Sequence, residues 1–160
     1  INAHAEGEIG YVAIDGVPEV PGDSLAAKLD HLNRVDGRLR RQLAVAPRGN
    51  PAASVNLVFS PQDKVADAGF LVLQPDQAHA SSGSNSICVV TALLEAGLVP
   101  MSEPVTRVTL ETAAGLVPTR AECADGDGGT DECECAFARR LLVRVGVAEE
   151  SSRAPRLARQ

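Results

Sequence analysis

The amino-acid sequence predicts a mixed α/β (α+β) domain, on three observations. Short apolar runs bounded by proline, glycine and aspartate occur at residues 51–61 and 66–75, and they are typical of buried strands. Residues 23–44 and 87–96 have helical spacing of their apolar residues instead. The hydrophobic fraction is 44% but the aromatic fraction only 2%, so we expect a core of valine, leucine, isoleucine and alanine. Strands before and after each helix place the chain in the mixed class.

The first part of the chain is expected to form a strand, a turn, a short second strand and a helix. The turn lies at Asp15-Gly16, a dipeptide typical of hairpins, within a segment rich in β-branched residues. Asp23 or Ser24 is the expected N-cap of the helix that follows. We expect Gly37 to divide that helix into two pieces.

The second part is expected to contain a buried helix and another hairpin. Residues 87–96 have only Thr91 and Glu95 as polar interruptions, so this helix should be buried on nearly every side. Gly97 suits the position just after a helix end. Two alternating runs flank residues 113–115, which predicts paired strands. We therefore expect a sheet that encloses a helix of about three turns.

Composition and charge exclude several classes of partner. The chain has 15 Lys+Arg against 21 Asp+Glu, a formal net charge of −6, which argues against a phosphate-backbone partner. Few aromatic residues are available for base stacking. No apolar run approaches the ~20 residues that span a bilayer, and the N-terminus lacks a signal-peptide pattern. We expect no nucleic acid, no membrane partner and a cytoplasmic protein.

The four cysteines predict neither a disulfide framework nor a metal centre. Cys133 and Cys135 with a distant Cys123 match no common zinc spacing. The acidic segment 125–136 does not match a calcium loop. The calcium-loop pattern needs Asp or Asn, Gly and Glu at positions where this chain has Gly129, Thr130 and Ala136. Cys88 lies within the apolar helix, where we expect it to pack as a small hydrophobic residue. We expect no metal.

A run of small polar residues precedes the buried helix. Ser82, Gly83 and Ser84 lead into its first turn, where backbone N–H groups are unpaired and the helix dipole places about half a positive charge. A carboxylate could lie on the amides of Gly83 and Ser84, with the Ser82 hydroxyl beside it. Serine and asparagine are also the preferred N-cap residues, so capping alone explains the same run. Both interpretations stay open on these residues.

Five blocks of the sequence form a wider pattern: HAEGE (4–8), GVPEVPGDS (16–24), PRGN (47–50), SSGSNSICVVTALLEAGLVP (81–100) and ETAAGLV (111–117). In this order they resemble the proline racemase family, which includes hydroxyproline epimerases and 3-hydroxyproline dehydratases. The resemblance implies a proline racemase-like N-terminal domain at residues 1–124. Residues 125–160, an acidic turn and then an arginine-rich tail, fall outside it and are expected to be divergent, with disorder as one interpretation.

The resemblance also implies a fold, a reaction and a site. The fold is diaminopimelate epimerase-like, a mixed sheet wrapped around a central apolar helix. The reaction is cofactor-independent proton abstraction at the α carbon of proline or hydroxyproline, with Ser82 as the catalytic residue and Gly83 and Ser84 as substrate-binding residues. Racemases of the family usually have cysteine at the position of Ser82. The Ser-Gly-Ser-Asn form resembles the hydroxyproline epimerases, so an isomerase of the hydroxyproline 2-epimerase type is expected.

The second domain of the family has no counterpart in this sequence, which leaves alternatives open. One is a trans-3-hydroxyproline dehydratase-like activity, since loss of a β-hydroxyl can follow the same proton abstraction. Another is a truncated, non-catalytic half-domain that keeps only a carboxylate-binding helix N-terminus. A homodimer that rebuilds a two-sided cleft is a third, because a half-site lacks the opposite acid/base group. The small-molecule partner is proline or hydroxyproline in the catalytic versions.

Overall fold

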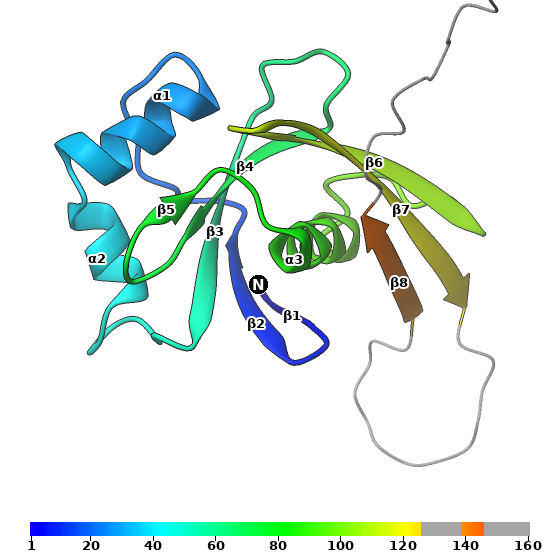
Figure 1. The fold of residues 1–160 in the computed structure, drawn as a ribbon. Coiled ribbons are helices and arrows are strands. Elements are labelled where there is room, and N and C mark those ends of the chain that lie inside the picture. The colour runs from blue at the N-terminus through cyan, green and yellow to red at the C-terminus, as the bar shows by residue number, and fades with distance from the viewer. Residues whose placement is uncertain (126–138, 146–160) are drawn as a thin grey trace, which may run out of the picture.

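A computed structural model describes residues 1–125 and 139–145 of the chain (Figure 1). The strands are β1 (Asn2–Ala5), β2 (Glu8–Ala13), β3 (Ala53–Phe59), β4 (Ala68–Leu73), β5 (Ala78–His79), β6 (Val105–Thr112), β7 (Gly115–Asp125) and β8 (Arg139–Val145). The helices are α1 (Leu25–Asp30), the π-helix η1 (His31–Val35), α2 (Arg38–Ala44) and α3 (Gly83–Glu95).

These strands form one curled, mixed sheet. Its order is β1-β2-β3-β4-β6-β7-β8, and β5 pairs with β4. The β2–β3 and β4–β6 pairs are parallel, and the other neighbours are antiparallel. The α1–η1–α2 segment lies at one end of the sheet, while α3 lies against its inner side (Figure 1). The expectation of a mixed α/β fold is confirmed.

Strand β4 is buried on both faces, which explains its continuous apolar sequence. Side chains alternate between the faces of a strand. Phe70 and Val72 belong to the core cluster that contains the α3 residues. Leu71 and Leu73 belong to the second cluster, with Leu25 of α1. The strand therefore joins two apolar cores, one on each side of the sheet.

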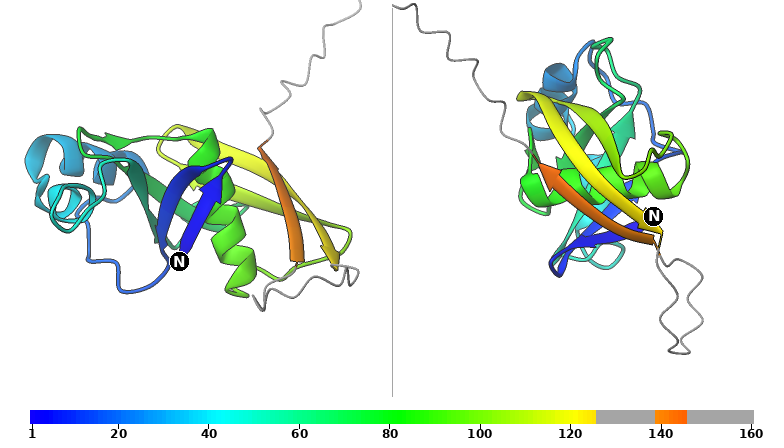
Figure 2. Two further views of the ribbon diagram at one scale, coloured as in Figure 1. Left: turned by 90° about the horizontal axis from the view of Figure 1, so that it is seen from below. Right: turned by 90° about the vertical axis from the view of Figure 1, so that its right-hand side faces the viewer.

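Helix α3 packs with most of its side chains buried. The buried apolar residues are Cys88, Val89, Val90, Ala92, Leu93 and Leu94. The helix contacts β1, β2, β3, β7 and β8, and Figure 2 shows it beside the first two. At its C-terminus the Leu98 N–H donates to the Leu93 carbonyl at 3.0 Å, and Gly97 has a φ of 68°. This is a Schellman ending, so the expected role of Gly97 is confirmed.

The first hairpin lies earlier in the chain than the sequence analysis placed it. Strands β1 and β2 pair across a two-residue turn at Glu6 and Gly7, whose φ values are 49° and 93°. Two consecutive positive φ values match the twist of a tight hairpin. The hairpin expected at Asp15-Gly16 is wrong, since no strand lies between residues 14 and 24. Prolines follow that turn, and proline has no N–H to donate to a strand ladder.

The other expected local features are confirmed. Ser24 caps α1, because its Oγ accepts from the Ala27 N–H at 3.1 Å. Gly37 separates η1 from α2, as a residue with poor helix propensity at that place predicts. The second hairpin is formed by β6 and β7, with Thr112 opposite Gly115 across the turn.

Several predictions from the sequence fall partly outside the described residues. Residues 126–138, which include most of the rejected calcium loop, and residues 146–160 of the tail are among them. Strand β8 lies within the expected tail and pairs with β7. The domain boundary at residue 124 stays a prediction. Across residues 1–125 and 139–145, no helix is long and apolar enough to cross a membrane.

Truncation of a buried side chain of β4, in the core cluster that contains the α3 residues, should destabilise the protein strongly. Phe70 is 0% exposed on β4. Phe70→Ala is expected to lower the free energy of unfolding by about 3–5 kcal/mol, because a buried aromatic ring is replaced by a cavity. Val65→Ala is the matched control, since Val65 is 65% exposed; it should change stability by less than about 0.5 kcal/mol. Urea denaturation measures both, and similar losses would contradict the assigned core.

Candidate functional site

Ser82 is the N-cap of α3. Its backbone is extended, with φ −158° and ψ 132°, and its Oγ accepts from the backbone N–H of Asn85 at 3.4 Å. The Asn85 side-chain Nδ2 donates to the same oxygen at 3.0 Å. The Oγ of Ser84 lies 3.2 Å from the Ser82 Oγ. The capping interpretation is confirmed, while the ligand role of these residues stays a prediction.

Gly83 is the first residue of α3 and lies open to the surface. A Cβ added at this position would meet no atom within 4 Å, so packing does not require a glycine here. The backbone amides of Gly83 and Ser84 belong to the first turn, whose N–H groups have no acceptor within the helix. The absence of a side chain leaves these two amides accessible to a small ligand.

A buried hydrogen-bonded network lies directly beneath Ser82. Asn85 is 1% exposed, and its Oδ1 accepts from Asn56 Nδ2 at 2.8 Å. Asn85 Nδ2 also lies 3.4 Å from the Oγ of Ser54, which accepts from Gln74 Nε2 at 3.0 Å. Asn56 and Ser54 are neighbours on the α3 side of β3. The network therefore connects the N-terminus of α3 to the middle of the sheet.

Sequence reasoning missed Asn56 and Ser54, although a signal was present. Both are polar residues inside the otherwise apolar run of β3, and both are buried. A buried polar side chain has to be hydrogen-bonded, so each such residue within a core strand predicts a polar partner on the same side of the sheet. The partner itself, Asn85, is 29 residues from Asn56 and could not be chosen from spacing alone.

Cys88 packs in the core, as expected for a small hydrophobic residue. It is 1% exposed, and burial together with the nearby charge of Glu8 raises the pKa of its thiol. A Cβ added at Gly10 would lie 2.9 Å from Cys88 Sγ, so the glycine allows β2 and α3 to approach closely. The raised pKa keeps the thiol neutral near pH 7, which removes its nucleophilic form.

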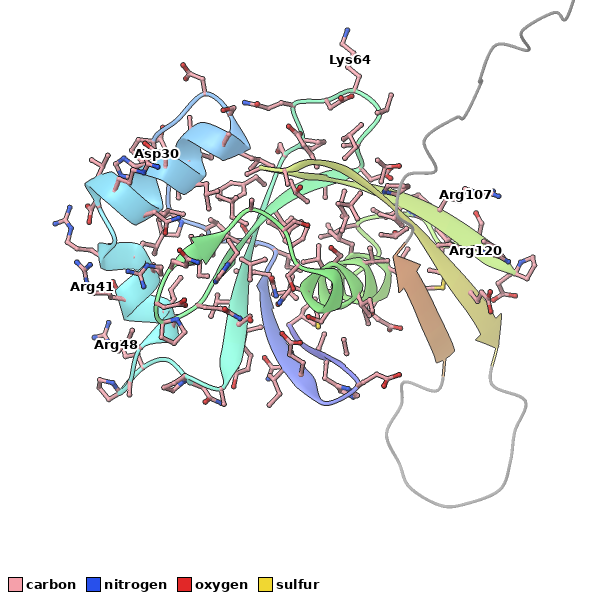
Figure 3. All side chains as sticks on the ribbon, viewed as in Figure 1. Asp30, Arg41, Arg48, Lys64, Arg107 and Arg120 are labelled. Carbon is pink, nitrogen blue, oxygen red and sulfur yellow. The ribbon has the colours of Figure 1, made fainter. Side chains whose placement is uncertain are left out.

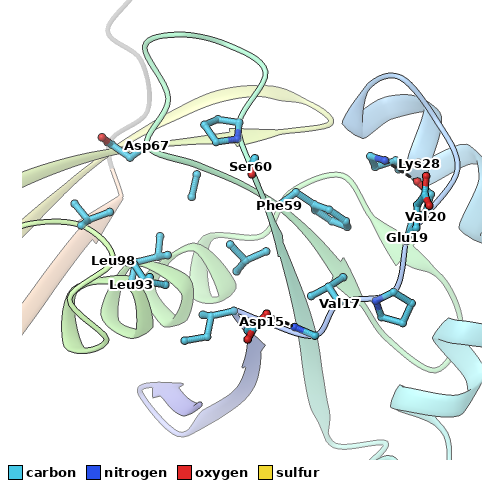
Figure 4. A pocket seen from close by; sticks show the side chains of 17 residues that line it. Asp15, Val17, Glu19, Val20, Lys28, Phe59, Ser60, Asp67, Leu93 and Leu98 are labelled. Atoms are coloured by element: carbon cyan, nitrogen blue, oxygen red, sulfur yellow. Dashed lines mark hydrogen bonds between the residues drawn. The ribbon is translucent and has the colours of Figure 1, made fainter.

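A hollow of about 500 Å³ lies at the opposite end of α3 (Figure 4). Leu93 and Leu98 line it from the helix end, and Phe59 lines it from β3. On its rim Lys28 Nζ donates to the Val20 carbonyl at 2.6 Å. None of the residues from 82 to 84 lines this hollow. The candidate site is therefore a surface at the helix N-terminus and not this cavity.

The labelled basic side chains lie at the periphery of the molecule, away from α3 (Figure 3). Arg41 and Arg48 extend from the side of α2, and Arg107 and Arg120 from β6 and β7. Among the residues that the structure describes, no group of three or more His, Cys, Asp or Glu could hold a metal ion. Anion recognition at the N-terminus of α3 would accordingly depend on backbone amides and hydroxyl groups.

Comparison with known proteins decides the family. The family model described as Proline racemase matches residues 1–150. The chain belongs to the proline racemase family. The resemblance seen in the five sequence blocks is thus confirmed, and the match extends past residue 124.

Similar proteins from the family include enzymes and solved structures. The 4-hydroxyproline 2-epimerases of Rhizobium etli and Allorhizobium ampelinum are 61% and 60% identical over 128 residues, which are 79% of this chain and 37% of each relative. A hydroxyproline epimerase from Agrobacterium vitis with bound trans-4-hydroxy-L-proline is 59% identical, with a TM-score of 0.76 over 78% of this chain and 37% of its own. A probable proline racemase from Agrobacterium radiobacter with bound carbonate has the same TM-score at 60% identity, over 78% of this chain and 37% of its own. The chain thus spans little more than a third of the length of these relatives.

The buried state of Cys88 predicts its reactivity. Iodoacetamide is expected to modify Cys88 at least about 100-fold more slowly in the folded chain than in urea, because the reagent needs an accessible thiolate. Peptide mass spectrometry after timed quenching gives the rate at this residue. Equal rates in the folded and unfolded chain would contradict the packing of Cys88 against β2.

Proposed function

We propose that this chain carries one side of the active site of a cofactor-independent amino-acid epimerase that acts on 4-hydroxyproline. Ser82 is the proposed catalytic residue, and the amides of Gly83 and Ser84 are the proposed substrate-binding groups. The observation that carries the proposal is the Ser82 hydroxyl beside two accessible amides at the N-terminus of α3, in a chain about 60% identical to 4-hydroxyproline 2-epimerases.

The substrate carboxylate would lie on the two amides. Proton loss from the α carbon moves negative charge onto the carboxylate oxygens, so N–H donors placed there stabilise the transition state more than the ground state. The helix dipole adds to this effect, because its positive end points at the same oxygens. Ser82 stands beside the amides, where its hydroxyl can exchange a proton with one face of the α carbon.

We infer a diaminopimelate epimerase-like half, with α3 as its central helix and residues 1–124 as its extent. The contacts of α3 with five strands support this assignment. Epimerisation needs a second acid/base group on the opposite face of the α carbon. A further domain or a second copy of this chain would have to supply it.

A non-catalytic carboxylate-binding half is the second candidate. The described site is open at Gly83, which leaves a bound ligand in contact with water. The non-catalytic half would bind the carboxylate at the same position as the epimerase but would not transfer a proton. Hydrogen exchange at the α carbon therefore distinguishes the two candidates.

Hydrogen exchange tests the epimerase directly. At concentrations where a second copy of the chain supplies the opposite acid/base group, the purified chain is expected to replace the α proton of trans-4-hydroxy-L-proline with deuterium in D2O, and Ser82→Ala should lower the rate at least about 100-fold, as loss of an acid/base group does. Proton NMR follows the α-proton signal. Thr91→Val is the matched control on α3, two turns from Ser82, and should exchange like the parent chain.

No exchange in a chain shown by circular dichroism to be folded would remove the epimerase activity of this chain. Exchange that persists in Ser82→Ala would leave the reaction but assign it to another residue. The dehydratase-like outcome is tested in a parallel sample with trans-3-hydroxy-L-proline, because only a hydroxyl on the β carbon can leave after abstraction of the α proton; loss of that substrate signal would favour it.

Substitution of Gly83 should separate binding from folding. Gly83→Val places a side chain over the two amides, where no atom lies within 4 Å, so the melting temperature should stay nearly unchanged. Binding of trans-4-hydroxy-L-proline, measured by isothermal titration calorimetry, should weaken by more than about tenfold, because the carboxylate loses its approach to the N–H groups. Unchanged binding in a folded variant would place the carboxylate elsewhere. Thr91→Val again serves as the control.

A further inference from the structure

Asn85 determines which hydrogen-bonding role is left to the Ser82 hydroxyl. Its backbone N–H and its Nδ2 both donate to Ser82 Oγ, at 3.4 and 3.0 Å. A serine hydroxyl has two acceptor sites and one donor. Because both acceptor sites face Asn85, the O–H bond of Ser82 is free to point toward the Ser84 Oγ, 3.2 Å away, or toward a ligand in its place.

Contacts with the sheet favour one direction of the Asn85 amide. The carbonyl of Tyr11 can only accept, and Asn56 Nδ2 lies 3.4 Å from it, so Asn56 presents its NH₂ group on this side. The same Nδ2 donates to Asn85 at 2.8 Å, which requires the Asn85 Oδ1 there. The NH₂ group of Asn85 therefore faces Ser82 and Ser54. This direction rests on the 3.4 Å contact with the Tyr11 carbonyl of β2, while the buried Oδ1 of Asn56 has no hydrogen-bond partner among the described residues.

The reversed arrangement is costly. Turning the Asn85 amide over would bring two NH₂ groups together at 2.8 Å and direct its oxygen at Ser82. Asn56 is 0% and Asn85 1% exposed, so water cannot compensate the lost hydrogen bonds. No freely rotating hydroxyl lies between the Tyr11 carbonyl and Ser82 that could reverse the direction.

We propose that Asn85 is a positioning residue. It makes Ser82 the proton donor to the α carbon, and it stabilises the negatively charged Ser82 oxygen that is left after the transfer. This inference rests on the epimerase proposed above. The O–H bond of Ser82 breaks as the C–H bond forms, and its electron pair stays on the Ser82 oxygen. Two N–H groups of Asn85 stabilise that negative oxygen until water returns a proton. The α proton leaves to the group on the opposite face.

A thiol at position 82 reports these donors without any need for activity. Ser82→Cys introduces a group whose anion can be titrated, and the rate of iodoacetamide labelling at position 82, followed by peptide mass spectrometry from pH 6 to 10, gives its pKa. N–H donors that stabilise the anion lower this pKa. Asn85→Asp, added to Ser82→Cys, keeps an acceptor for Asn56 but replaces the Nδ2 donor with a carboxylate oxygen.

In the variant that combines Ser82→Cys with Asn85→Asp, the pKa of the thiol at position 82 is expected to be higher by about 1 than in Ser82→Cys alone. Below the pKa this appears as about tenfold slower labelling. Asn85→Ala in the same background removes Nδ2 but keeps the backbone donor and should give a smaller rise. Ser86→Ala is the matched control, because Ser86 Oγ donates to the Ser82 carbonyl at 2.8 Å and not to its hydroxyl. Its pKa at position 82 should equal that of Ser82→Cys alone.

Two results would overturn the inference: a pKa at position 82 that is unchanged by both Asn85 variants while circular dichroism shows them folded, or an equal rise with Ser86→Ala. The exchange experiment on the parent chain decides the epimerase separately. If the pKa of the thiol at position 82 rises in the Asn85 variants but the parent chain does not exchange the α proton, the proposed reaction is removed, while the hydrogen bonds from Asn85 to position 82 are supported. Exchange with an unchanged pKa would keep the reaction and remove the role of Asn85.

Discussion

The hydrogen bonds of the buried Asn85 amide tie the candidate site to the sheet. A buried amide left without partners costs about 1–3 kcal/mol for each missing hydrogen bond, so Asn85 has to stay on Asn56 and Ser54. This requirement fixes the first turn of α3 relative to β3 at a point where the helix dipole faces the surface. That attachment also fixes the positions of the neighbouring residues Ser82, Gly83 and Ser84. A site on a loop alone would lack such a fixed support.

Packing around α3 supplies the remaining rigidity. The helix lies against strands from both halves of the sheet, and Gly10 allows its close approach to β2 beside Cys88. On the other side of the sheet, α1 packs on β4, whose Phe70 and Val72 belong to the same core cluster as the residues of α3. A shift of α3 would therefore disturb two cores, because β4 contributes alternate side chains to each. This packing opposes a movement of the helix N-terminus toward a ligand. It therefore favours an anion site that is already formed without a ligand over a site that forms only on binding.

The sequence predicted features that depend on neighbouring residues and missed those that depend on distant ones. Ser24 as a cap, Gly37 as a break and Gly97 as a helix end follow from local backbone chemistry. The first hairpin was misplaced because both Glu6-Gly7 and Asp15-Gly16 carry turn signals, and only pairing with β3 selects the strand between them. Asn56 could be recognised as an unusual polar residue in a strand, but its partner depends on how α3 crosses β3. The site residues Ser82 to Ser84 came from a family resemblance together with helix-terminus chemistry, and their roles remain proposals.

The candidate site and the hollow lie at opposite ends of α3, which differ in charge. The hollow beside Leu93 lies at the C-terminal end of α3, where the helix dipole is negative and disfavours a carboxylate. The N-terminal end offers the opposite sign but no walls, since Gly83 is open. A favourable charge for a carboxylate and a hollow are thus at opposite ends of one helix in the described part of the chain. A carboxylate ligand would choose the N-terminal end on electrostatic grounds, and only a covering surface from outside this segment could exclude water there. The proposed reaction would therefore depend on a partner surface, while the Ser82 hydroxyl is held within this chain by Asn85 and the strand beneath it.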